Sequence, residues 1–102
     1  MAGKPSDGIA KRQEALDALE YDFLAEKAAA LGRAGEKMER VLKRLAESDE
    51  AAGEGAERTL KEAADAVYAY FIQRELCGLR RHDEIIRQYR IPGRVLVRLG
   101  AK

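Results

Sequence analysis

The sequence predicts an all-α fold, and three observations support this prediction. Ala, Glu, Leu, Lys and Arg dominate the 102 residues, and these residues enter a helix at low free-energy cost. Proline occurs twice and threonine once, which argues against a domain rich in β-sheet. Apolar residues recur with the 3.6-residue period of an amphipathic helix. We therefore expect a long N-terminal helix, a central buried helix and two short C-terminal helices in a small bundle.

The length of the chain fits a single domain. Residues 1–9 contain two glycines and a proline and predict a flexible tail, so residues 10–102 would form the helical domain. No apolar run approaches the roughly 20 residues of a membrane span, and the polar N-terminus lacks the apolar segment of a signal peptide. A single cysteine excludes an internal disulfide. Together these features predict a cytoplasmic protein without membrane contact.

The first helical pattern runs from about Ala10 to Ser48. Its apolar and small positions span 29 residues, which is eight turns of an ordinary helix rather than a strict heptad repeat. Lys27 falls inside this stripe, so its ammonium group must reach solvent or a partner. The stripe consists of Leu16, Leu19, Phe23, Ala30, Ala34, Met38, Val41 and Leu45.

Gly32 and Gly35 interrupt this pattern, and each costs nearly 1 kcal/mol relative to alanine inside a helix. Either they let another helix approach closely, or the helix bends or breaks there. We favour close approach, because alanines surround the glycines and no proline, asparagine or serine accompanies them.

A glycine-containing acidic loop over residues 49–56 separates this pattern from a second helix at about Glu57 to Cys77. Every residue from Val67 to Ile72 is apolar or aromatic, so this half of the helix should form the centre of the fold. Gly78 is well placed to end the helix in the left-handed conformation.

Two short helices should follow, and the first is expected at about Asp83 to Tyr89. Its two acidic residues, Asp83 and Glu84, lie near the positive end of the helix. The second should run from Pro92 to Leu99, because proline is favoured at the first helical position.

The expected helix lengths leave part of the first helix without a partner. At about 1.5 Å per residue, the first helix is near 57 Å long and the second near 31 Å. The apolar stripe continues into the overhang, where the C-terminal helices, a fold-back at the glycines or a second copy must cover it. We predict a homodimer built on the first helix. The candidate interface residues are Leu16, Leu19, Phe23, Ala28, Gly32 and Gly35.

An uneven distribution of charge suggests nucleic-acid binding as the alternative function. Residues 1–72 hold 11 basic and 15 acidic side chains, whereas residues 73–102 hold 8 basic and 3 acidic. Residues 82–99 resemble a degenerate helix-turn-helix, which would direct basic side chains toward DNA. Ile86 and Arg90 depart from that motif, where a small residue and glycine are usual. A helical hairpin that caps the bundle explains the same pattern. The candidate nucleic-acid contacts are Arg90, Arg94 and Arg98.

The sequence contains no grouping that predicts catalysis, a metal site or a cofactor. His82, the single histidine, has no nucleophile beside it, and we interpret it as a surface or capping residue. Cys77 lies at the negative end of a helix, which opposes thiolate formation, so we interpret it as a small buried residue. No Cys/His cluster and no phosphate-binding loop occurs. We therefore expect a non-enzymatic module that binds protein and acts as a homodimer.

Three segments together resemble a family of short bacterial all-helical proteins classed as a domain of unknown function. They are residues 18–35, 71–80 and 88–100, and the resemblance covers most of residues 17–100. Arg90 is a departure where glycine is usual. The resemblance implies a bacterial protein but no site residues. If the family has a site, Gln73–Arg80 is where we expect it, although a helix cap with an ion pair between Arg74 and a glutamate accounts for the same residues.

Overall fold

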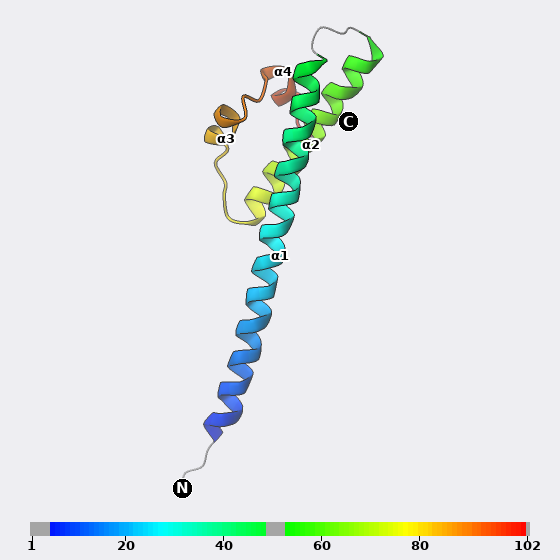
Figure 1. Cartoon of the computed structure of the whole chain (residues 1–102). Helices are drawn as coiled ribbons and strands as arrows, with labels where there is room; N and C mark the ends of the chain where they lie inside the picture. The colour runs from blue at the N-terminus through cyan, green and yellow to red at the C-terminus, as the bar shows by residue number, and fades with distance from the viewer. Residues whose placement is uncertain (1–4, 49–52, 102) are drawn as a thin grey trace.

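A computed structural model describes residues 5–48 and 53–101, and within these ranges the chain forms helices and no strand. The long first helix packs antiparallel against the second, and two short helices follow beside them (Figure 1). The predicted all-α fold is therefore confirmed. The helices are α1 (Pro5–Glu47), α2 (Glu54–Leu76), α3 (Asp83–Gln88) and α4 (Gly93–Leu96).

The helix boundaries differ from the predicted ones at several ends. α1 begins at Pro5, so residues 5–9 of the predicted tail are helical, while residues 1–4 lie outside the described residues. A proline at a helix start is favourable because its missing N–H would have no partner there. Residues 49–52 of the predicted loop also lie outside the described residues, and α2 begins at Glu54.

The last helix is shorter than predicted. α4 ends at Leu96 rather than Leu99. Pro92 is its N-cap with an extended backbone (φ −65°, ψ 148°), not its first helical residue. The Pro92 carbonyl accepts bonds from the amides of Val95 and Leu96, and a series of turns then carries the chain to Gly100. Apolar spacing alone did not distinguish these turns from a helix, because both place residues three apart on one side.

The hydrophobic core lies between α2, the C-terminal half of α1 and the C-terminal segment. Met38 of α1, Val67 of α2 and Val95 of α4 are the largest fully buried side chains. Tyr70 and Phe71 of α2 are also buried in this cluster. The apolar segment of α2 thus contributes to the centre of the fold, as predicted, but it is not buried all round, because Tyr68 and Ile72 are 46% and 37% exposed.

Backbone and side-chain contacts fix the end of α2 beside the middle of α1. Gly78 has φ 89°, its amide donates to the Glu75 carbonyl (2.9 Å), and the Leu79 amide donates to the Arg74 carbonyl (2.8 Å). This is the left-handed termination predicted for Gly78. The Lys27 ammonium donates to the Leu76 carbonyl (3.0 Å). This contact is favourable because the C-terminal end of a helix carries a partial negative charge. α2 therefore stops level with Lys27.

The N-terminal half of α1 extends alone beyond this point (Figure 1). Residues 5–26 would measure about 33 Å at the helical rise. The molecule is 80 Å long, and its radius of gyration is 20.9 Å, against about 13 Å for a compact domain of this size. α3 and α4 lie beside the other half of α1 (Figure 1). They therefore do not cover the overhang.

α1 is continuous through Gly32 and Gly35, so the helix does not break at the glycines. A Cβ at Gly35 would lie 3.1 Å from Cε1 of Tyr70, whereas a Cβ at Gly32 would have no atom within 4 Å. Close approach thus explains Gly35, and the approaching group is the Tyr70 ring of the same chain.

This difference predicts that alanine substitutions at the two glycines will change the free energy of unfolding differently. Gly32→Ala should raise the free energy of unfolding by about 1 kcal/mol, because alanine favours the helix and meets no neighbour. Gly35→Ala should gain clearly less or lose stability, because the buried Tyr70 ring must shift slightly to admit its methyl group. Urea unfolding at one fixed protein concentration measures both variants. An equal gain at the two positions would contradict the packing described here.

Candidate functional site

The overhang of α1 carries a face of exposed large apolar side chains, which we call the overhanging face: Ile9, Leu16, Leu19 and Phe23. Leu16, Leu19 and Phe23 are 59%, 64% and 61% exposed. Leu16 lies 29 residues, or eight turns, before the buried Leu45, so both point from the same side of the helix. The overhanging face is therefore the exposed continuation of the surface that α2 covers further along α1.

Leu24 flanks the overhanging face and is 56% exposed, whereas Tyr21, 73% exposed, lies on the opposite side of α1. Single exposed apolar residues are ordinary, but a contiguous group of this kind usually marks a contact surface.

The structure brings together only part of the predicted interface. Gly32 lies nine residues after Phe23, which is two and a half turns, so it is on the opposite side of α1. Gly35 is buried against Tyr70 within the chain's own hairpin. Leu16, Leu19 and Phe23 therefore share a surface that does not include either glycine.

Ala28 lines an apolar hollow of about 520 Å³ where α2 ends on α1. Leu24 and Leu31 of α1 form one wall of the hollow, and Leu76 and Cys77 form the other. The hollow directly adjoins the overhang, because Lys27 also lines it. The exposed apolar surface thus continues from the overhanging face to the end of α2.

Charge is unevenly distributed along the overhang. Lys11 and Arg12 lie near the start of α1 beside Glu14, whereas Asp22 and Glu26 lie about three turns later, after Asp17 and Glu20 and before Lys27. Glu26 makes a long, exposed contact of 3.5 Å with Arg33. Exposed pairs of this kind contribute little to stability, so the acidic end remains open to other cations.

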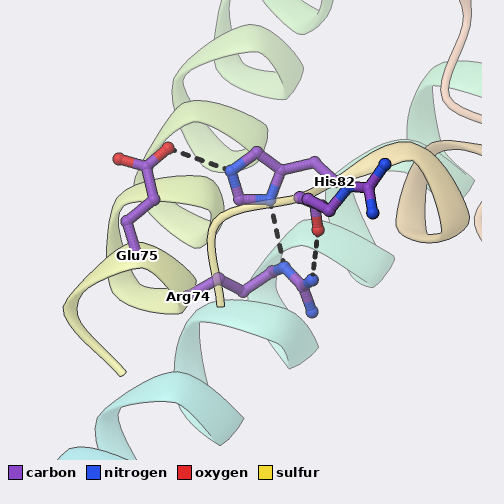
Figure 2. Close-up of polar contacts among 4 residues, drawn as sticks. Arg74, Glu75 and His82 are labelled. Atoms are coloured by element: carbon purple, nitrogen blue, oxygen red, sulfur yellow. Dashed lines mark hydrogen bonds and ion pairs between the residues drawn. The ribbon is translucent and has the colours of Figure 1, made fainter. Parts of the chain in front are cut away.

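The segment around Arg74, which the sequence singled out, forms a polar cluster with the loop after α2 (Figure 2). Arg74 donates from Nε to Nδ1 of His82 (3.1 Å) and from Nη2 to the Arg81 carbonyl (2.7 Å). His82 Nε2 lies 2.9 Å from Oε2 of Glu75. The predicted helix cap is present, but Arg74 bonds the loop rather than a glutamate.

This cluster anchors the loop and leaves His82 fully engaged. Because Arg74 Nε donates to Nδ1, the ring must carry its proton on Nε2, which donates to Glu75. The ring also stacks on Phe71 with centroids 4.1 Å apart, and its side chain is only 14% exposed. Both ring nitrogens and one face are thus occupied by the chain itself. His82 is the N-cap residue of α3, which agrees with the capping interpretation, but its side chain is largely buried rather than on the surface.

The three arginines proposed for nucleic-acid contact do not form one row. Arg98 donates to Glu57 of α2 (3.0 Å). Arg90 and Arg94 instead line a hollow against α1 with Lys43. α4 has four residues, about 6 Å of helix, which is less than two turns. Sequence reasoning missed Lys43, because nothing local connects it to an arginine 47 residues later.

Within the described ranges, no helix has the length and apolar character that a membrane span requires. The same residues contain no group of three or more His, Cys, Asp or Glu side chains placed to hold a metal ion.

The two bonds of Arg74 predict that lysine cannot replace it. Arg74→Lys keeps the charge but lacks the planar fork that reaches His82 and the Arg81 carbonyl together. We expect it to lower the free energy of unfolding by about 1–2 kcal/mol. Urea unfolding measures the loss, and Arg80→Lys, on the exposed part of the same loop, is the control. Unchanged stability of Arg74→Lys would contradict this anchoring role.

Comparison with known proteins gives a family but no activity. No curated protein matches the chain. No solved structure matches it either. The profile of a family of unknown function, DUF6665, matches residues 7–102, which is nearly the whole chain. The resemblance stated from the sequence is thereby confirmed: the chain belongs to this family of unknown function.

Proposed function

We propose that this protein is a non-enzymatic helical module that pairs with a second copy of itself through the overhanging face of α1. One observation carries the proposal. Leu16, Leu19 and Phe23 are about 60% exposed on the very side of α1 that forms the core further along. Burial of a leucine or phenylalanine side chain contributes roughly 1.5–3 kcal/mol, so a covering partner would be strongly favoured.

A second copy is the occupant that the charges favour. In an antiparallel pair, Lys11 and Arg12 of each copy would approach Asp22 and Glu26 of the other. A parallel pair would instead bring like charges together. These four side chains are therefore complementary between the two copies in one orientation, as a two-fold interface requires.

The length of the overhang supports the same arrangement. The partner's α1 would lie along the overhang, directly beyond the end of α2 at Leu76. It would run in the same direction as α2. Its first turns would meet the apolar hollow lined by Leu24, Ala28 and Leu76. Its positive N-terminal end would approach the negative C-terminal end of α2. Each copy would thus complete the helical pair that the other lacks.

We place this module in the bacterial cytoplasm. The family resemblance supports a bacterial source, and the single cysteine suits a reducing compartment. An unlike helical protein on the same face is the competing occupant. It would leave the isolated chain monomeric, so the oligomeric state separates the two.

The chain should be a dimer by light scattering at micromolar concentration, and Leu19→Glu or Phe23→Glu should make it a monomer by placing charge in an apolar contact. Val97→Glu is the matched control, because Val97 is 82% exposed at the other end of the molecule. A monodisperse monomer of the unmodified chain would overturn the proposal.

Charge reversals test the orientation of the two copies. Lys11→Glu with Arg12→Glu should weaken the dimer, because both ends of the overhang then become acidic. Adding Asp22→Arg and Glu26→Arg should restore it, since an antiparallel pair again brings opposite charges together. Sedimentation at low salt gives the dissociation constants, and high salt should reduce the differences. Failure of the fourfold variant to recover would exclude the antiparallel pair.

A further inference from the structure

A second surface lies at the opposite end of the molecule from the overhang, in the hollow between α1 and the turn that joins α3 to α4. The hollow has a volume of about 510 Å³, within the range of small-molecule sites. Lys43, Arg90 and Arg94 supply three positive charges, and Glu39 supplies one negative charge. Its charge is therefore net positive.

Two of these cations have no ion-pair partner among the residues that the structure describes. Other basic residues nearby are paired, Arg44 with Glu62 and Arg98 with Glu57. In the part of the chain that the structure describes, Lys43 and Arg90 form no ion pair. Their charges therefore remain available to a ligand.

The backbone at Arg90 is costly for an arginine. Arg90 has φ 51° and is the one described residue other than glycine with positive φ. Its amide donates to the Arg87 carbonyl (3.2 Å), and the Ile91 amide donates to the Ile86 carbonyl (3.0 Å). This is the same helix termination that Gly78 provides for α2, where glycine carries no penalty. A side chain retained in such a conformation points to a use for its guanidinium.

The remaining wall of the hollow provides a hydroxyl and an apolar surface. Tyr89 lines it and packs edge-on against Tyr70, with ring centroids 6.4 Å apart. Burial, reinforced by the neighbouring Tyr70 and Glu39, raises the pKa of Tyr89, so its hydroxyl remains a hydrogen-bond donor. Leu42 and Pro92 supply apolar surface beside it.

From these features we propose that the hollow binds a phosphorylated small molecule of about nucleotide size, with Lys43 and Arg90 holding its phosphate. A guanidinium forms paired bonds to phosphate oxygens, and an ammonium adds a point charge. The apolar wall at Leu42 and Pro92 would face the rest of the ligand. Extended nucleic acid fits less well, because Arg98 is engaged with Glu57 and adds no second phosphate position.

Calorimetric titration of the purified full-length chain, in whichever oligomeric state it adopts, with inorganic pyrophosphate and with adenosine monophosphate tests this proposal. We expect saturable binding that Arg90→Gly and Lys43→Gln each weaken by about tenfold or more, the loss expected for a charge-assisted bond. Glu39→Gln should instead tighten binding, because it removes the one opposing charge. Lys61→Gln is the control, since Lys61 pairs with Asp65 on α2.

The melting temperature distinguishes a loss of binding from a loss of folding. Without ligand, Arg90→Gly should melt about 4 °C or more above the unmodified chain, because glycine relieves the positive φ. A more stable protein that has lost affinity supports the proposal. Absence of saturable binding, or equal affinity in Arg90→Gly, overturns it. Tighter binding of duplex DNA that depends on Arg98 and falls steeply with salt also overturns it in favour of nucleic acid.

Discussion

The length mismatch between the two long helices determines most of this structure. α2 ends at Leu76 because Gly78 turns the backbone and Lys27 binds the last carbonyl, while α1 continues for another 22 residues or so. The chain after Gly78 returns along the far half of α1, so the whole core gathers at one end. What remains at the other end is a single helix, and an isolated helix in water depends on packing for its stability.

The polar contacts at the end of α2 hold this division in place. Arg74 binds the returning loop through hydrogen bonds to His82 and to the Arg81 carbonyl, and the Phe71 ring stacks on the imidazole ring of His82. The loop therefore leaves α2 in a fixed direction and carries α3 toward Tyr70. That path is also what brings the cation-rich C-terminal segment beside α1, far from the acidic stretch of the overhang.

Much of the fold could be predicted from periodicity, but the contacts between distant residues could not. The stripe from Leu16 to Leu45 identified α1 and its core side, and Gly78 identified the end of α2. The partner of Lys27 is a backbone carbonyl, which leaves no trace in residue identity. The role of Gly35 depends on Tyr70, and that of Lys43 on Arg90, both across the fold. Turns and short helices share a three-residue spacing, which is why α4 was predicted too long.

The unbroken course of α1 has a geometric consequence for a paired molecule. Two copies, each 80 Å long, that overlapped only along their overhangs would form a rod of roughly 130 Å. The folded end of each chain would then sit at an opposite tip of that rod, at a separation fixed by helical rise rather than by a linker. Ligands bound at the two tips would therefore be held at a fixed separation. A target with two sites at that separation would bind both ends of the dimer at once.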